Sequence, residues 1–170
     1  MIQVRQILAP EPALIPALSA LLMDSVHHGA SVGFLAPLPL TKARAYWEPV
    51  LDAAGPSLGL WVAEEEGQLL GSVQLARGQR ENGRHRAELQ KLFVASQARG
   101  RGIARILVEA AETHARTLGC TLLLLDTQTG SPAESIYSHW GWQKAGEIPD
   151  YAASPDGQLH PSSYFFKLLN

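Results

Sequence analysis

The stretch RAELQKLFVASQARGRGIARIL, residues 86–107, constrains the fold more than any other part of the chain. Its first half, up to Val94, is typical of a buried strand, and a helix is predicted to begin at Gly102. The turn between them is short and basic and contains two glycines. A strand, a turn and a helix N-terminus direct several free backbone N–H groups to one point, so the stretch predicts a phosphate-binding site.

Known phosphate motifs narrow the type of site. A Walker loop needs a lysine after its last glycine, and a dinucleotide fingerprint needs a third glycine where this chain has Arg105. The pattern that fits is Q-x-x-G-x-G-x-A, made by Gln97, Gly100, Gly102 and Ala104. It resembles the acyl-CoA pyrophosphate loop of the GNAT (Gcn5-related N-acetyltransferase) superfamily. An ordinary turn with solvated charges is the alternative interpretation.

Hydrophobic periodicity gives the order β-α-α-β-β-β-α-β-α-β-β, an α/β (α+β) pattern that matches the GNAT superfamily over the full chain. The strands are predicted at 3–8, 58–64, 69–75, 86–94, 121–125, 142–148 and 164–168, and the helices at 13–26, 41–51, 102–118 and 132–140. Thr41 is the expected N-cap of the second helix, and the aliphatic strand at 121–125 is expected to be covered on both faces. The GNAT fold implied here has a mixed central sheet of about seven strands flanked by about four helices.

Composition describes an ordinary globular chain. With 170 residues, 46% hydrophobic and 18% charged, residues 1–170 are predicted to form a single domain. A formal net charge of -2 implies no general attraction to nucleic acid, although eight of the fourteen Lys and Arg residues lie between Arg77 and Arg105. The single cysteine, Cys120, lies in an apolar run and is predicted to be a buried side chain.

No metal-ligand spacing of histidines and carboxylates is present in the sequence, so no metal is expected. The start, MIQVRQILAPEP, lacks the apolar core of a signal peptide, and no apolar run has the length of a membrane span. We therefore expect a cytoplasmic protein that binds neither nucleic acid nor a membrane. The sequence leaves the oligomeric state open, with a homodimer as one candidate assembly.

Further segments strengthen the resemblance. The run Tyr137-x-x-x-Gly141-Trp142 matches the superfamily, which more often has Phe after that glycine. The segments VHHGASVGF, RAELQKLFV and PDGQLHP together resemble the tabtoxin-resistance acetyltransferases within it. This implies acetyl-CoA as co-substrate. The expected cofactor contacts are Leu92, Phe93, Val94, Gln97, Arg99, Gly100, Arg101, Gly102, Ile103, Ala104, Ser131 and Tyr137.

Three side chains are candidates for proton transfer. Tyr137 is the candidate general acid for the departing thiolate, because a thiol has a reference pKa of about 8.5 and a tyrosine about 10. Glu88 and Asp126 are acids in otherwise apolar strands, and the resemblance supports them as bases that accept the amine proton. The alternatives are a salt bridge from Glu88 to Arg84 or Arg86, capping of a loop by Asp126, and a core tyrosine at Tyr137.

The acceptor pocket is expected beside the apolar loop GASVGFLAPLPL. His27, His28 and Phe34 are the candidate substrate contacts, although a histidine that interacts with a helix dipole is the alternative for the first two. The predicted function is acetyl transfer to a primary amine of a small molecule, such as the toxin tabtoxinine-β-lactam, in a ternary complex. A peptide or protein N-acetyltransferase and a non-catalytic CoA-binding sensor are the alternatives.

Overall fold

The computed structural model describes residues 1–55 and 58–170. Within these residues the chain forms one seven-stranded sheet and four α-helices. The strands are β1 (Gln3–Gln6), β2 (Leu58–Glu65), β3 (Gln68–Arg77), β4 (Arg86–Val94), β5 (Leu122–Gln128), β6 (Gln143–Ala153) and β7 (Leu159–Leu168). The α-helices are α1 (Ile15–His27), α2 (Leu40–Asp52), α3 (Ile103–Thr117) and α4 (Pro132–His139), with short 3-10 turns at Pro12–Leu14, Glu81–Gly83 and Ser96–Ala98.

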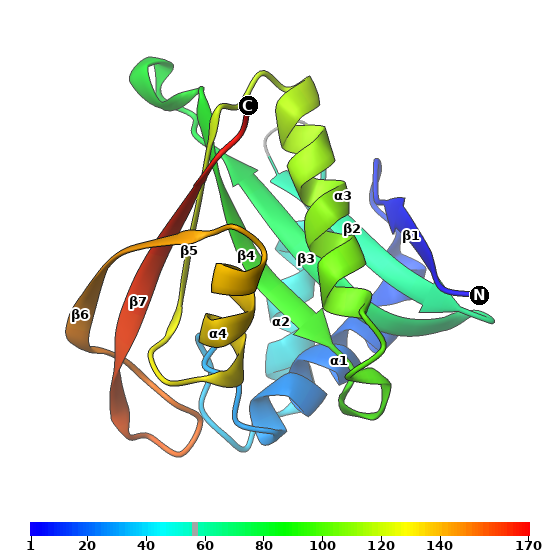
Figure 1. The fold of residues 1–170 in the computed structure, drawn as a ribbon. Helices are drawn as coiled ribbons and strands as arrows, with labels where there is room; N and C mark the ends of the chain where they lie inside the picture. Colours follow the sequence, from blue (N-terminus) through cyan, green and yellow to red (C-terminus); the bar gives the residue numbers. More distant parts are fainter. Residues whose placement is uncertain (56–57) are drawn as a thin grey trace.

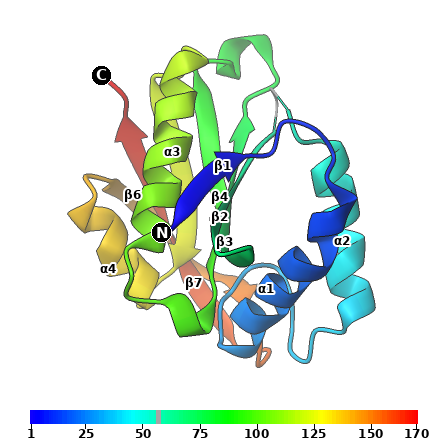
Figure 2. The ribbon, with the colours of Figure 1, turned by 90° about the vertical axis from the view of Figure 1, so that its right-hand side faces the viewer.

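The sheet runs in the order β1-β2-β3-β4-β5-β7-β6, and β4–β5 is its parallel pair. Helices α3 and α4 cover one face, whereas α1 and α2 cover the other (Figure 2). The core fills both layers: Leu107 of α3 and Leu22 of α1 are fully buried. Trp47 of α2 packs edge-on against Phe93 of β4, with ring centroids 6.1 Å apart. The predicted order of elements and the α/β fold are therefore confirmed.

Some predicted boundaries are wrong. Helix α2 begins at Leu40 with Pro39 as its N-cap, so Thr41 lies inside the helix and does not cap it. Strand β6 runs past Pro149 to Ala153, and β7 starts at Leu159. Such an extension is tolerated because β6 is an edge strand, where a proline removes no essential ladder bond. The hairpin that joins these strands turns at Pro155-Asp156-Gly157, as predicted.

The central strands separate after a short contact. Strand β4 pairs with β5 over Arg86–Glu88 and Leu122–Leu124 alone, and the two then diverge (Figure 1). Among the residues that the structure describes, the remainder of β4, up to Val94, has no strand partner on that side. Leu122 and Leu124, on one face of β5, are only half-buried although they lie in the paired segment, which corrects the prediction that β5 is covered on both faces. The divergence leaves a wedge between the two halves of the sheet.

A bulge in β4 lies at the same level. The pairing of β3 with β4 shifts register, because Gln74 pairs with Gln90 whereas Ser72 pairs with Phe93. Two residues of β4 therefore stand opposite Val73 alone. One of them, Lys91, has a left-handed backbone with φ 54°. A bulge of this type bends its strand and changes where the next side chains point.

No helix of the described residues is both long and apolar enough to cross a membrane.

Candidate active site

The glycine turn presents free backbone amides at the start of α3. Gly100 and Gly102 have φ values of 77° and 78°, a left-handed conformation that suits glycine. No heavy atom lies within 4 Å of a Cβ built on either glycine, so a ligand has room to approach. The first backbone bond of α3 runs from the Ile106 N–H to the Gly102 carbonyl, at 3.3 Å. Among the described residues, the amides from Gly100 to Arg105 have no acceptor outside the helix, which leaves them available to an anion at the start of α3.

Helix α1 fixes the start of this turn. The Asp24 carboxylate accepts hydrogen bonds from the Ser96 N–H at 2.7 Å and from the Ser96 hydroxyl at 2.8 Å. Arg101, in the turn itself, pairs with Glu65 of β2 at 2.6 Å. The turn is thus held from two sides, which preorganises its amides. These two contacts join residues far apart in the chain, so no local sequence pattern indicates either of them.

Of the other predicted cofactor contacts, Leu92 and Val94 lie half-buried on the unpaired part of β4, and Phe93 is a core residue. Gln97 and Arg99 are exposed at the turn. Ser131 is the N-cap of α4, and its hydroxyl lies 3.4 Å from that of Thr127. These side chains come from both halves of the sheet and from the glycine turn, and they remain predicted contacts of the cofactor.

Tyr137 is buried on α4, within an aromatic cluster. Its ring lies 6.0 Å from those of Trp140 and Trp142 and 6.1 Å from that of Phe165, measured between centroids. Burial, with a smaller effect from the negative charge of Asp126, raises the pKa of Tyr137 to about 12. The phenol therefore keeps its proton at neutral pH.

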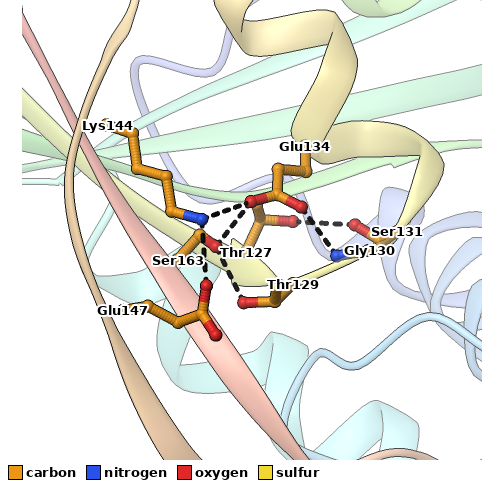
Figure 3. Close-up of polar contacts among 8 residues, drawn as sticks. All are labelled: Thr127, Thr129, Gly130, Ser131, Glu134, Lys144, Glu147 and Ser163. Carbon is orange, nitrogen blue, oxygen red and sulfur yellow. Dashed lines mark hydrogen bonds and ion pairs between the residues drawn. The ribbon is translucent and has the colours of Figure 1, made fainter.

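A polar latch holds α4 against the sheet (Figure 3). At its centre the Glu134 carboxylate accepts hydrogen bonds from the Gly130 N–H (2.6 Å), the Ser163 hydroxyl (2.6 Å) and the Lys144 ammonium (3.0 Å). These donors come from the loop before α4, from β7 and from β6. Hydrogen bonds donated by Ser163, Gly130 and Lys144 lower the pKa of Glu134 to about 2, so the Glu134 carboxylate is ionised at neutral pH.

The two carboxylates share one face of the sheet. Glu88 pairs in register with Leu124, and Asp126 is two residues further along β5, so strand alternation places Glu88 and Asp126 on the same side. It is the α1–α2 face, because Gln74, in register with Gln90, bonds to Tyr46 of α2 at 2.9 Å. No ion pair links Glu88 to Arg84 or Arg86, so the salt-bridge alternative is not formed in this structure.

The electrostatics of this pair favour a base of raised pKa. Partial burial raises the pKa of both carboxyl groups. The charge of Asp126 raises the pKa of Glu88 further, whereas nearby Lys91 opposes the rise at each. A carboxylate of raised pKa is a better proton acceptor near neutral pH than an ordinary one. Both side chains are open to solvent, which gives an accepted proton a way out.

Sequence reasoning missed two residues of this face. Lys91 is half-buried, and its ammonium donates to the Val32 carbonyl at 3.0 Å. Tyr164 lies opposite Asp126 in register and packs edge-on against Tyr151, with centroids 5.6 Å apart. A charged lysine inside an apolar strand was a usable signal for the first. Tyr164 carried no such signal, because core packing explains an aromatic residue in this strand equally well.

The apolar loop after α1 covers part of the same face. It is bonded to the rest of the fold at Lys91 and, through its Ala36 N–H, to the Pro155 carbonyl at 2.9 Å. His27 accepts the Leu38 N–H at 3.1 Å, and His28 lies 2.8 Å from the Asp24 carbonyl. Both histidines thus have structural partners. Phe34 packs against Tyr46, with ring centroids 5.5 Å apart, and remains a candidate wall of the pocket.

No cluster of three or more histidine, cysteine or acidic side chains suited to a metal occurs within residues 1–55 and 58–170.

Comparison with known proteins identifies the class. The model of the Acetyltransferase (GNAT) family matches residues 24–142, so the chain belongs to this family. The chain is 42% identical over 93 residues to N-acetyltransferase 8 of Rattus norvegicus, an alignment that covers 52% of this chain and 41% of that protein. It is 37% identical over 107 residues to an uncharacterized N-acetyltransferase of Azospirillum brasilense, and covers 62% of each chain. The chain thus spans less than two thirds of the length of these curated relatives.

Solved structures agree over the whole chain. A ribosomal-protein-alanine N-acetyltransferase from Brucella melitensis superposes with a TM-score of 0.80 at 25% identity and covers 98% of this chain and 99% of that chain. A putative acetyltransferase from Salmonella typhimurium, solved with its cofactor acetyl-CoA, gives a TM-score of 0.77 at 17% identity and covers 100% and 95%. The predicted superfamily is confirmed. The narrower resemblance to the tabtoxin-resistance acetyltransferases is not: the curated relatives with names belong to the N-acetyltransferase 8 group.

Proposed function

We propose that this protein is an acetyl-CoA-dependent N-acetyltransferase that acts on a primary amine of a small molecule. One observation carries the proposal: the wedge beside β4 lies between an amide-lined turn, a protonated Tyr137 and two carboxylates of raised pKa. Family membership and the cofactor bound by the Salmonella typhimurium protein support acetyl-CoA as the donor.

The residues fit acetyl-CoA by their chemistry. The amides from Gly100 to Arg105 would bind its diphosphate, because they point outward at a helix N-terminus. Backbone groups of β4 near Leu92 and Val94, left without a strand partner, would bind the pantetheine arm and the thioester oxygen. Acetyl-CoA itself supplies an activated acyl group. The recognition rests mainly on main-chain groups, which the wedge leaves free.

The side chains divide the proton transfers between them. Glu88 or Asp126 accepts a proton from the acceptor's ammonium, so that the amine lone pair can form the new N–C bond. As the C–S bond breaks, Tyr137 donates its phenolic proton to the leaving sulfur, and the nitrogen loses its second proton as the amide forms. Solvent carries that second proton to the Tyr137 phenolate, which restores the acid. One amide and one free thiol are produced for each amine and thioester consumed. The carboxylates lie on one sheet face and Tyr137 on the α4 side, so acid and base approach the wedge from opposite directions.

Cofactor recognition is tested by calorimetry with acetyl-CoA. Wild-type protein should bind, and Gly102→Asp should not, because the substitution places a negative charge and a strained left-handed backbone at the diphosphate site. Gly102→Ala is the matched control, since its Cβ meets nothing within 4 Å and it adds strain without charge. Absence of binding by the wild type would contradict the proposal.

The acceptor is identified by a screen of amines that follows release of free thiol, with tabtoxinine-β-lactam included. The resemblance of VHHGASVGF and PDGQLHP to toxin-resistance acetyltransferases motivates that compound. A second candidate is a peptide N-terminus, favoured by the Brucella melitensis structure, whose name describes a ribosomal-protein-alanine N-acetyltransferase. Faster turnover of N-terminal peptides than of free amines would select it. Binding of acetyl-CoA without turnover of any acceptor would indicate a CoA-binding sensor instead.

A further inference from the structure

Lys91 occupies an unusual position in the acceptor face. It is one of the two bulge residues opposite Val73, and its φ of 54° is a conformation that residues other than glycine rarely adopt. Its ammonium lies under the apolar loop, 3.0 Å from the Val32 carbonyl. A Cβ built on Gly33 would lie 3.8 Å from the same nitrogen. The bulge therefore delivers a lysine head group to the underside of the loop that flanks the pocket.

The same ammonium belongs to the group of charges around the proposed bases. It interacts with both Glu88 and Asp126, and its charge lowers the pKa of each carboxyl group. The protein surroundings in turn lower the pKa of Lys91 through burial. A desolvated ammonium binds an anion more strongly than a surface one, because less water competes.

Lys91 also has unused hydrogen-bonding capacity. An ammonium carries three N–H donors, and one partner, the Val32 carbonyl, accepts from it among residues 1–55 and 58–170. Neither carboxylate lies within salt-bridge distance of it in this structure, although both are near enough to affect its pKa. The remaining donors are thus available to a ligand that enters the pocket.

An acceptor that carried only an ammonium would meet repulsion from Lys91 beside attraction from the carboxylates. An acceptor with a carboxylate near its amine could place the carboxylate against Lys91 and the ammonium against Glu88 and Asp126. We propose that Lys91 is a specificity-determining residue that binds an anionic group, such as a carboxylate, of the acceptor, so that the protein prefers zwitterionic amines. This inference rests on the proposed N-acetyltransferase function and adds a chemical class to its acceptor.

The test uses acceptors matched in all but the anion. L-tryptophan, L-tryptophanamide and tryptamine form one set, and L-leucine, L-leucinamide and 3-methylbutylamine form another. Thiol release gives kcat/KM for each compound. Wild-type protein should favour the acid of each set. Lys91→Met should lower kcat/KM for the acids by on the order of 10- to 100-fold, the usual effect of removing a charge-assisted bond, and change the amides and amines by less than about 3-fold.

Two further variants separate specificity from structure. Lys91→Gln removes the charge but keeps a donor for the Val32 carbonyl, so it should lose the preference for acids as Lys91→Met does. Lys42→Met, on the exposed surface of α2, removes a lysine far from any proposed role and should leave the preference unchanged. An equal loss for acids, amides and amines in the Lys91 variants would show that the lysine only secures the loop, and would overturn the inference.

A binding experiment makes the inference independent of turnover. N-acetyl-L-tryptophan and its amide are titrated into protein saturated with CoA. The acid should bind more tightly to the wild type, and Lys91→Gln should abolish the difference. Equal affinities in the wild type, or no binding of the acid, would overturn the role of Lys91. Failure of the proposed function is distinct, because it would appear as absence of thiol release from every acceptor.

Discussion

The environment of Tyr137 suits one chemical step, the donation of a proton to the leaving thiolate. Its burial in an aromatic cluster keeps the phenol protonated. Tyr137→Phe removes only the hydroxyl and leaves the packing of the ring in place. We expect kcat to fall on the order of 10²-fold or more, the typical contribution of a general acid, with the Kd for acetyl-CoA unchanged. Single-turnover kinetics and calorimetry measure the two quantities, and an unaltered kcat would remove Tyr137 from the mechanism.

Glu88 should affect rate and stability in opposite directions. A carboxyl group of raised pKa stabilises the folded state below its unfolded pKa, and this contribution is lost as pH rises through the folded pKa. At neutral pH the ionised group therefore costs stability, so Glu88→Gln should raise Tm while it lowers kcat. In Glu88→Gln the remaining candidate base is Asp126, and an aspartate has a lower reference pKa than a glutamate. The fall of the rate at acidic pH should therefore move to lower pH. Asp126→Asn is the matched variant, and an unchanged profile in both would exclude the pair as bases.

The sequence identified the candidate residues of the site better than it identified the contacts between them. Glu88, Asp126 and Tyr137 stood out because a charged or phenolic group in an apolar setting is costly to bury without a purpose. Lys91 has the same signature, but its link to Val32 depends on the bulge, whose extra residue leaves no mark in the hydrophobic alternation. The Asp24–Ser96 contact spans most of the first hundred residues, and no local pattern encodes such a pairing.

Helix α4 is the element whose position the Glu134 latch controls. The helix has eight residues and is too short to be stable alone, so it depends on tertiary contacts. Glu134 has a lowered pKa, so its stabilising effect is present above its ordinary value and disappears as pH falls toward about 2. Glu134→Gln should therefore lower the free energy of unfolding at neutral pH by about 1–3 kcal/mol. Below pH about 4.5 the difference from the wild type should shrink.

Glu147→Gln provides the control for this prediction. Glu147 bonds to the same lysine, Lys144, at 3.0 Å, but its side chain is 43% exposed. A surface pair of that kind contributes less than about 1 kcal/mol. Denaturant titrations of the two variants across pH would contradict the role of the latch if both lost the same amount. The expected difference in stability comes from the position of the two side chains. Glu134 connects α4 to β7 through Ser163, whereas Glu147 contacts Lys144 within the same strand, β6.

The elements themselves were predictable where the apolar pattern of the sequence is strong, whether one face is buried, as in α3, or both faces, as in β2 and β3. The strongly amphipathic α3 and the apolar β2, β3 and β4 were predicted to within a few residues at their ends. The errors lie where periodicity is weak. Strand β6 is exposed along most of its length and contains Pro149, so its pattern did not distinguish a strand from a loop. Its extension comes from pairing with β7, which a single sequence does not reveal.

The central sheet of the molecule consists of two halves that are joined at three paired positions of β4 and β5. A ligand that bridges the halves should add to their cohesion as well as bind. At about 100 times its Kd, acetyl-CoA should stabilise the fold by about 2.7 kcal/mol, which corresponds to a rise of about 5–10 °C in Tm for a chain of this size. N-acetylcysteamine thioester, which lacks the diphosphate, is the control and should give a much smaller rise. Equal shifts with both ligands would contradict binding at the turn.

The wedge has a consequence for how proteins of this architecture diversify. In the proposed binding mode its donor end is formed by peptide groups, which every amino acid possesses, so most replacements of side chains would leave those groups where they are. The opposite end is formed by the identities of a few side chains on one sheet face, and single codon changes can alter it. Homologous proteins with this scaffold can thus keep the same acyl donor while substitutions change which amine is accepted.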